Sequence, residues 1–174
     1  MSGNKPGDVG EPRRAKMTFE LDSANGWPPV GAESIWVTYV DEDVVAIDNV
    51  PWFIKDIAVA DRVRAQVDAA GNLTPGAKIS WAGHRTIRVA PFAGSRFYGN
   101  LPALLDMFVP FGVTGEGIER FGLVALDVPP EAQTEKVKRL LARGFDEGWW
   151  DYEEGCIDDS WDALPMGPGN GPID

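Results

Sequence analysis

The sequence contains one cysteine and one histidine among its 174 residues. A single cysteine, Cys156, excludes an intramolecular disulfide. One histidine and one cysteine cannot complete a zinc site, and the sequence has no D-x-[DN]-x-[DN]-G loop for calcium. The acidic run near the C-terminus is typical of a solvated face rather than of a cation site. We therefore predict neither a bound metal nor another cofactor.

Basic residues and long apolar runs are also scarce. The chain has 16 Lys and Arg against 27 Asp and Glu, a formal net charge of −11. Nucleic-acid binding needs a basic face, so this charge argues against it and fits a basic protein partner. No stretch approaches the roughly 20 apolar residues of a membrane span, and the first residues lack the apolar run of a signal peptide. We expect a cytoplasmic protein without a membrane segment; its oligomeric state does not follow from the sequence.

The sequence does contain enough apolar material for a folded core. Hydrophobic residues make up 44% of the chain, and its length suffices for one sizeable core or for two small lobes that share an interface. We predict an α+β fold, with a β-rich lobe (a small barrel-like or curled sheet) at residues 16–83 and a ferredoxin-like lobe at residues 84–157. Residues 1–15 are predicted to be disordered, and residues 158–174 to form an acidic tail rich in glycine and proline.

Extended runs separated by turn residues support the β-rich lobe. Residues 34–40 and 44–47 are rich in β-branched and aromatic residues on either side of an acidic turn. In the corner that follows, residues 48–53, the Asp and Asn side chains can bond backbone groups, and the Pro, Trp and Phe are expected to be buried. Further extended runs at residues 61–68 and 77–82 flank a hairpin tip. Roughly five strands result, enough for a curled sheet.

The second half alternates strands with helices. After an extended run, apolar residues fall at i, i+3, i+4 and i+7 from Leu101, which predicts one helical stripe. Residues 118–128 are typical of a central strand. We expect a second helix from Pro129 to about Gly144, followed by a last strand at residues 149–157. This order of elements is that of a ferredoxin-like sandwich.

Several short motifs occur in a fixed order along the chain. They are Trp27-Pro28-Pro29, Glu33-Ser34-Ile35-Trp36, Asp48-Asn49-Val50-Pro51-Trp52-Phe53, Ala60-Asp61-Arg62-Val63, Gly83-His84-Arg85-Thr86-Ile87-Arg88-Val89, Val128-Pro129-Pro130 and Trp150-Asp151-Tyr152-Glu153-Glu154-Gly155. Together they resemble a bacterial family of domains of unknown function. In that pattern an E-x-x-W strand is followed by an N-x-P-aromatic corner, a G-D-x-V-like strand, a G-H-x-T-x-R-like strand and a P-P-containing βαβ unit.

This resemblance covers about residues 16–157 and implies no activity, because the family has none assigned. It directs attention to Trp36, Asn49, Pro51, Asp61 and His84. The chain departs from the pattern at Ala60, where glycine often precedes the aspartate.

His84 is the first candidate for chemistry. Its side chain is the only one here that titrates near neutral pH when unperturbed, and it lies at the predicted junction of the lobes, where clefts often form. Oriented by Asp48 or Asp61, it could act as a general base, and Arg88 could hold an anionic group. The alternative is a structural histidine bonded to a backbone carbonyl, because the sequence marks no nucleophile beside it.

The second candidate is an acidic aromatic stretch near the end of the chain. Its residues are Trp149, Trp150, Asp151, Tyr152, Glu153 and Glu154. Adjacent tryptophans on a strand point to opposite faces, so one can be buried while the other is exposed among carboxylates. Such a surface can present an aromatic hot spot to a basic partner. The alternative is that Trp150 packs on the second helix or under the C-terminal tail.

These patterns leave the function unassigned, with two hypotheses. The first is a non-enzymatic, acidic protein-binding module, comparable in charge and size to immunity proteins, antitoxins and regulators. The second is a small enzyme or anionic-ligand binder that uses His84 in the cleft between the lobes.

Overall fold

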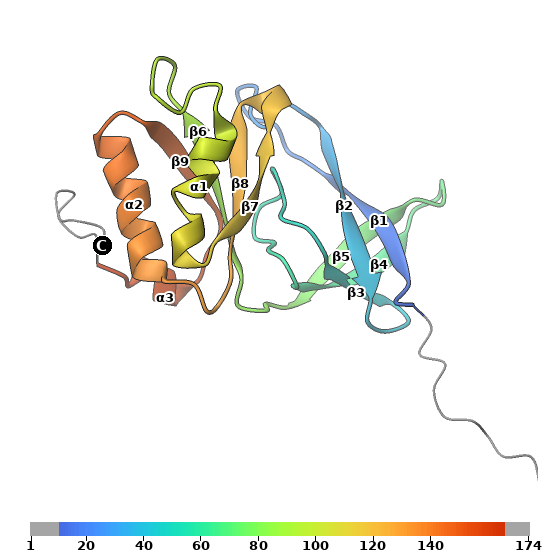
Figure 1. Ribbon diagram of the computed structural model, residues 1–174. Helices are drawn as coiled ribbons and strands as arrows, with labels where there is room; N and C mark the ends of the chain where they lie inside the picture. The colour runs from blue at the N-terminus through green and yellow to red at the C-terminus, as the bar shows by residue number, and fades with distance from the viewer. Residues whose placement is uncertain (1–10, 166–174) are drawn as a thin grey trace, which may run out of the picture.

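A computed structural model describes residues 11–165 of the chain. Two antiparallel sheets lie side by side, and helices cover the outer face of the second sheet (Figure 1). The protein is therefore a mixed α+β fold, as the order of elements in the sequence predicts.

The first sheet is a meander whose strands follow chain order. They are β1 (Arg14–Glu20), β2 (Ala32–Tyr39), β3 (Val44–Ile47), β4 (Arg62–Val67) and β5 (Leu73–Ser80). Side chains alternate along the strands, so one face buries residues such as Met17, Ile35 and Val45. β1 and β5 approach each other, but no hydrogen-bonded ladder joins them in the described part of the chain. The sheet is thus curled and open, and it does not close into a barrel.

The second sheet has the spatial order β7-β8-β6-β9. Its strands are β6 (Arg85–Pro91), β7 (Thr114–Ile118), β8 (Leu123–Val128) and β9 (Trp150–Cys156). All neighbouring pairs are antiparallel. β8 is buried at every position, as its continuous apolar run predicts for a central strand. β7 and β9 are the edge strands.

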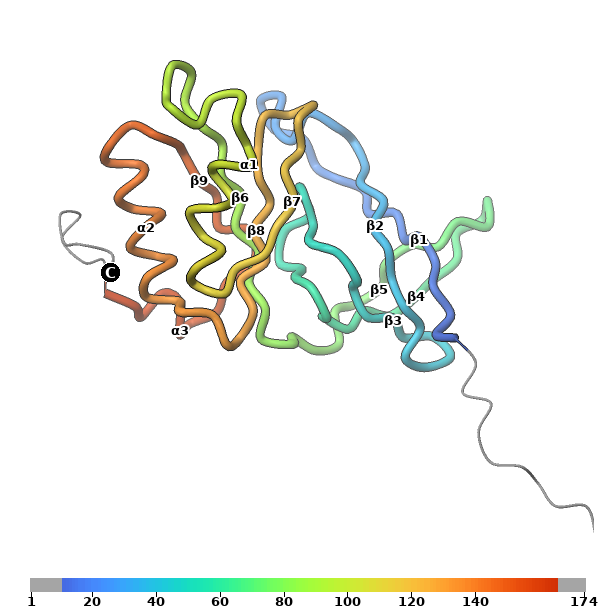
Figure 2. Tube along the Cα trace, viewed as in Figure 1, coloured from blue at the N-terminus to red at the C-terminus, as the bar shows by residue number. Residues whose placement is uncertain are grey.

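Helices cover the face of this sheet that points away from the first sheet (Figure 2). They are α1 (Leu101–Asp106), α2 (Thr134–Asp146) and the short α3 (Asp159–Asp162), with single 3-10 turns η1 (Val109–Phe111) and η2 (Glu119–Phe121) in the connections. The predicted stripe buries Leu101 and Leu104 of α1, and Asn100 caps the helix by accepting the amide of Ala103. None of the helices within residues 11–165 has the length and apolar character needed to cross a membrane.

The helix α2 differs from its prediction at both ends. It begins at Thr134, because the proline pair at residues 129–130 forms a turn ahead of it. Gly144, expected to end the helix, lies inside it. A Cβ atom at Gly144 would overlap the indole of Trp150. Glycine is therefore required there for close packing rather than for chain reversal.

The folded part extends past the predicted limits of the two lobes. β1 begins at Arg14, two residues before the predicted start. At the other end, Trp161 of α3 is fully buried in the core of the second lobe. Residues 158–165 are therefore not a loose tail, because a large aromatic side chain anchors them. The rest of the predicted termini, residues 1–10 and 166–174, lies outside the described residues.

The two sheets meet through the corner at residues 48–53. The contact joins Val50 and Phe53 of the corner to Ile118, Leu123 and Ala125 of the second sheet. Because alternate side chains of β8 point to opposite faces, this strand supplies both the helix-covered core and the joint between the sheets. The corner is therefore the element that positions one lobe on the other.

Candidate functional site

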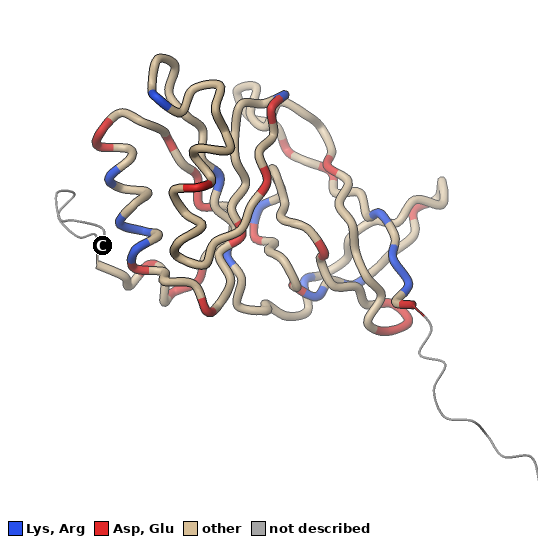
Figure 3. The backbone as a smooth tube through the Cα atoms, viewed as in Figure 1, with Lys and Arg blue, Asp and Glu red and all other residues tan. Residues whose placement is uncertain are grey.

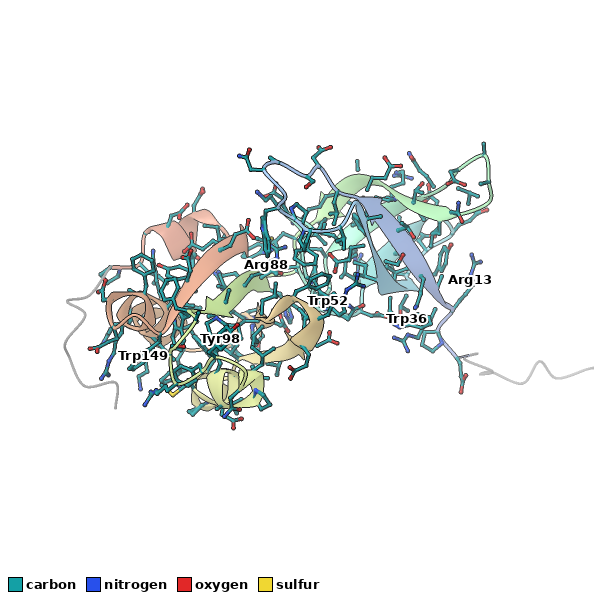
Figure 4. All side chains as sticks on the ribbon, turned by 90° about the horizontal axis from the view of Figure 1, so that it is seen from above. Arg13, Trp36, Trp52, Arg88, Tyr98 and Trp149 are labelled. Carbon is teal, nitrogen blue, oxygen red and sulfur yellow. The ribbon has the colours of Figure 1, made fainter. Side chains whose placement is uncertain are left out.

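Arg88 lies on β6 in the joint between the sheets, beside Trp52 (Figure 4). Its guanidinium donates to the carbonyls of Trp52 and Ile54, and to the carboxylate of Glu153 at 3.2 Å. Burial lowers the pKa of Arg88, and the carboxylates of Glu153 and Glu33 oppose this effect. The side chain is only 3% exposed. Arg88 is thus occupied by structural partners and is not available for the anionic group predicted for it.

Glu33, on β2, also holds the same backbone segment. Its carboxylate accepts the amides of Trp52, Phe53 and Ile54 at 2.6, 2.8 and 3.1 Å. A buried carboxylate is tolerated when several donors satisfy its oxygens. This role was not predicted. Glu33 shares strand parity with the buried Ile35, and a glutamate on the core-facing side of a strand is the signal that could have identified it.

Asp48, predicted as a possible partner of His84, serves the first sheet instead. Its carboxylate accepts the hydroxyl of Thr38 at 2.7 Å and pairs with Arg14 at 3.0 Å. The neighbouring Asn49 accepts the amide of Trp36 at 2.7 Å. These bonds are the turn chemistry expected of an Asp-Asn corner.

Asp61, the other predicted partner, is fully buried. Its carboxylate accepts the amides of Ala58 and Ala82 at 2.9 and 3.0 Å, and it pairs with Lys78 at 2.7 Å. All of these contacts fix the chain at the ends of β4 and β5. Asp61 is therefore a structural residue and does not orient His84.

The partner of His84 is Asp127, on β8. Nδ1 of His84 lies 2.7 Å from one carboxylate oxygen of Asp127, and the hydroxyl of Thr114 lies 3.5 Å from the other. Burial raises the pKa of Asp127, while its hydrogen bond with His84 acts in the opposite direction. No second hydrogen bond to the imidazole is found within residues 11–165. A carboxylate-oriented imidazole with one free nitrogen is the arrangement of a general base.

Asp127 also lines a hollow of about 360 Å³ between the corner and β7. Asp48, Glu116 and Asn49 lie on its wall, with Val50 and Val59 as apolar neighbours. Asp48 therefore lines the same hollow as Asp127, the partner of His84. Among the described residues, Asp48 and His84 themselves form no hydrogen bond with each other. Three carboxylates around one hollow disfavour an anionic ligand, so any occupant is expected to be neutral or cationic.

Metal-ligand chemistry finds no support in the side-chain geometry. Within the described residues, no three His, Cys, Asp or Glu side chains are grouped so that they could hold an ion. The thiol of Cys156 is buried, and burial raises its pKa.

Trp150, predicted as part of a binding surface, is fully buried. Its ring packs on Phe97 and Phe108 with centroids 5.3 and 5.6 Å apart, and its Nε1 donates to the carbonyl of Leu141 at 3.2 Å. Strand parity directs this side chain toward the helices. The assignment of Trp150 to a binding surface is therefore wrong, and the alternative of packing against the second helix is correct.

Trp149 is half-buried at the start of the same segment. The guanidinium groups of Arg96 and Arg143 lie 4.3 and 5.7 Å from its ring centre, and Phe97 meets it edge to face. Its accessible face is thus flanked by cations and not, as predicted, ringed by carboxylates. Trp149 therefore packs on Phe97 and under the guanidinium groups of Arg96 and Arg143.

The remaining predicted binding residues, Asp151 to Glu154, lie on the edge strand β9. Asp151 is exposed, and Glu153 pairs with Lys55 at 3.5 Å as well as with Arg88. Glu154 accepts the indole N–H of Trp161 at 2.7 Å. Acidic side chains therefore lie on both faces of this strand.

A groove runs along each side of β9. The Trp27 groove, of about 390 Å³, lies on the face toward the first sheet and is lined by Trp27, Arg88, Val89, Ala90, Leu123, Asp151, Tyr152 and Glu153. The guanidinium of Arg88 is already engaged by the corner and by Glu153. The Phe145 groove, of about 460 Å³, lies on the helix-covered side and is lined by Lys138, Phe145, Asp151, Tyr152 and Glu154. Trp27 is 44% exposed and Phe145 is 51% exposed. The two grooves combine aromatic walls with carboxylates on the strand between them.

Fold and site together define an α+β domain in which a clamped corner joins two antiparallel sheets. The family model of a domain of unknown function, DUF4265, matches residues 33–152. The chain belongs to this family, which confirms the predicted membership of a family without an assigned activity. The match begins at Glu33 and includes Arg88, so both residues that hold the corner lie inside the family domain.

A solved structure resembles this fold over most of its length. It is the crystal structure of a hypothetical protein from Neisseria gonorrhoeae, with a TM-score of 0.61 and 15% sequence identity. The similarity covers 85% of this chain and 96% of that one. At this identity the likeness shows a shared fold. No curated protein matches the sequence, and neither the family nor the solved relative carries an assigned function.

Proposed function

We propose that the protein is a non-enzymatic binding module that holds a basic segment of a partner protein against β9. The Trp27 groove carries this proposal, because it places an exposed aromatic ring opposite carboxylates on an edge strand. The comparison with immunity proteins, antitoxins and regulators rests on size and charge alone. A cytoplasmic setting and a protein partner in place of nucleic acid follow from the sequence-based predictions and belong to the same proposal.

The chemistry of the groove suits a lysine or arginine side chain. The exposed Ala90 offers apolar surface to the aliphatic stem, and the partly exposed indole of Trp27 lines the same groove, where an indole ring can attract a cation. Of the carboxylates, Glu153 is already paired with Arg88 and Lys55. Asp151 is exposed and makes no ion pair in the described residues. One of its carboxylate oxygens accepts the amide of Tyr152 at 2.8 Å, and the other is left as the principal acceptor for an incoming cation.

The distribution of charge supports the same choice of surface. Lys and Arg residues are concentrated on α2 and β1, whereas all charged residues of β9 are acidic (Figure 3). Charge complementarity of this kind speeds association and selects the sign of the partner. A basic partner is therefore directed to β9 rather than to α2.

We also propose a ferredoxin-like arrangement for the second lobe. It is supported by the order β6-α1-β7-β8-α2-β9 along the chain and by the spatial order β9-β6-β8-β7, with helices on one face. In this arrangement the last strand is an edge strand, so a free edge at β9 follows from the topology.

The binding proposal is tested with a basic heptapeptide, Ac-KVKVKVK-NH2, and its acidic counterpart, Ac-EVEVEVE-NH2. We expect isothermal titration to detect binding of the basic peptide alone. Asp151→Lys should weaken that binding by at least tenfold, and Trp27→Ala should also weaken it. Glu42→Lys, the same charge change in the exposed β2–β3 turn, should leave it within twofold. Equal effects of the two lysine substitutions would mean that only net charge matters and would overturn the site.

A second candidate function is a small enzyme or ligand binder built on His84 and Asp127. The 2.7 Å contact between these residues, next to a hollow of about 360 Å³, favours it. Asp127 would orient the imidazole, and the free nitrogen would accept a proton from water or from a bound ligand. Because three carboxylates line the hollow, the ligand would be neutral or cationic rather than anionic.

This second function is tested by screening neutral and cationic small amides and esters for turnover and for NMR shifts of the His84 ring. A ligand that shifts this ring and is turned over by the native chain, but not by His84→Gln, would establish it. A loss of stability in His84→Gln, with no ligand effect on the native ring, would assign the pair to structure and overturn this second function.

A further inference from the structure

We infer that β9 takes its partner as an added β-strand, so that an extended basic peptide continues the second sheet beyond its present edge. The inference rests on the proposed binding function and specifies how the partner is held. β9 pairs with β6 on one side only, and no other strand within residues 11–165 pairs with it. A strand edge offers unpaired N–H and C=O groups that an extended chain can match.

The usable edge has a defined end. At the end of β9, the amide of Asp56 donates to the carbonyl of Gly155 at 2.7 Å. Lys55 in the same loop pairs with Glu153, and the pairing with β6 shifts register opposite Gly155. The loop of the first lobe therefore closes the edge near Gly155, and residues 150–154 remain for a partner.

The two grooves supply what an added strand needs beyond its backbone. Successive side chains of a strand point to opposite faces of the sheet. A peptide beside β9 would therefore direct alternate residues toward the Trp27 groove and toward the Phe145 groove, which lie on the two faces of the strand. Strand-adding receptors draw affinity from the backbone and specificity from such alternate pockets. An edge strand with a groove on each face is the observation that distinguishes this mode from a simple charged patch.

Charge identifies the occupant. Asp151 lines both grooves, Glu153 lines the Trp27 groove, and Glu154 lines the Phe145 groove. Lys138 also lines the Phe145 groove, but its ammonium donates to the carbonyl of Trp161. Lysine or arginine at alternate positions of the peptide would face these carboxylates, and such cross-strand pairs of opposite charge stabilise a sheet. A second copy of this chain is disfavoured, because β9 against β9 would set carboxylates against carboxylates. The occupant is therefore a basic extended segment of another protein.

Backbone pairing is tested by methylating peptide nitrogens, which removes N–H donors without changing charge. Two versions of Ac-KVKVKVK-NH2 are made, one N-methylated at the lysines and one at the valines. Only one set of amides can face β9. We expect one version to bind the full chain at least tenfold more weakly than the parent peptide, and the other to bind within threefold. Hydrogen exchange of the full chain should show new protection within residues 150–154 on adding the parent peptide.

The outcomes separate this inference from the proposed function. If the basic peptide binds and Asp151→Lys weakens it, but both methylated versions bind like the parent, the function stands and strand addition is overturned. If no basic peptide binds, both fail. Concentration-dependent protection of residues 150–154 in the peptide-free protein, with dimers in sedimentation, would make a second copy the occupant and would also overturn the inference.

Discussion

Glu33 and Arg88 bind the backbone of the same three-residue segment, Trp52–Ile54. Glu33 accepts its three amide N–H groups, and Arg88 donates to two of its carbonyls. The segment belongs to no helix or strand, so these two side chains replace the backbone partners that a sheet would provide. The charges of the buried Glu33 and the buried Arg88 thereby offset each other across the backbone segment that both residues bind.

Removing either member of this clamp should destabilise the protein strongly. Arg88→Ala removes the buried cation near Glu33 and leaves Glu153 with only the more exposed Lys55, and we expect a loss of about 3–5 kcal/mol in the free energy of unfolding. Glu33→Gln removes a charged acceptor and should cost about 1–3 kcal/mol. Urea unfolding monitored by tryptophan fluorescence measures both. Arg62→Ala, at an exposed arginine on β4, serves as control and should change stability by less than about 0.5 kcal/mol.

The double variant adds a test of the coupling itself. Because both residues bind one segment, the effects of Glu33→Gln and Arg88→Ala should not add, and the interaction energy should exceed about 0.5 kcal/mol. Strictly additive losses would show that each residue acts alone.

Gly144→Ala should destabilise the protein, against the usual preference of helices. In a helix interior, alanine is normally favoured over glycine by about 1 kcal/mol. Here the new methyl group would overlap the indole of Trp150, and overpacking of this kind costs about 1–3 kcal/mol. Thermal unfolding should show a lower midpoint for Gly144→Ala. Gly31→Ala, at a position with no neighbouring atoms within 4 Å, should show little change, and a rise in stability for Gly144→Ala would contradict the observed packing.

Ala60→Gly should stabilise the protein. Ala60 adopts a positive φ of 64°, a left-handed conformation that costs an alanine about 1–2 kcal/mol. Glycine avoids that cost and gives back about 0.4–1 kcal/mol through the greater freedom of the unfolded chain. We expect a net gain of up to about 1 kcal/mol in chemical unfolding. Ala70→Gly, which has no such backbone strain, should lower stability, and the same sign for both variants would refute this reasoning.

Asp158 should stabilise the fold at neutral pH and lose this effect in acid. Burial raises the pKa of Asp158, but the hydrogen bonds from Arg85, at 2.5 Å, and from Ser160 outweigh it and leave the pKa below its usual range. A depressed folded-state pKa stabilises the protein above the unfolded value of about 3.9. This stabilisation disappears as the pH falls through the lower folded-state pKa.

The measurement compares the native chain with Asp158→Asn in urea at pH 7 and at pH 3. We expect the variant to be less stable by about 1–3 kcal/mol at pH 7 and the difference to shrink at pH 3. Asp41→Asn, in an exposed turn, should show no such pH dependence. A difference for Asp158→Asn that is equal at the two pH values would contradict the role of its charge.

Local patterns in the sequence were enough to predict most elements. The alternation over residues 16–22 predicts β1, the stripe from Leu101 predicts α1, and the continuous apolar run at residues 123–126 predicts β8. Each of these signals is periodic, and periodicity follows directly from strand and helix geometry. The proline pair predicts the start of the second helix too early, at Pro129 rather than Thr134, because such a pair suits a turn as well as a first helical turn.

The site could not be predicted in the same way, because it depends on register between distant strands. Asp127 meets His84 since β6 and β8 pair antiparallel with Arg85 opposite Val128. No local pattern encodes that register, so Asp48 and Asp61 were equally good choices from the sequence. Likewise, a shift of one residue in β9 decides whether Trp149 or Trp150 is buried.

The clamped corner also has a consequence for biosynthesis. During synthesis, Val50 and Phe53 leave the ribosome well before the β8 residues that cover them. Glu153, the ion-pair partner of Arg88, follows later still. At elongation rates of about 5–20 residues per second, the nascent chain carries an uncovered apolar face and a half-made ion pair for several seconds. We expect the first sheet to stay partly folded and accessible to chaperones until β9 has left the exit tunnel. The domain then completes its fold cooperatively.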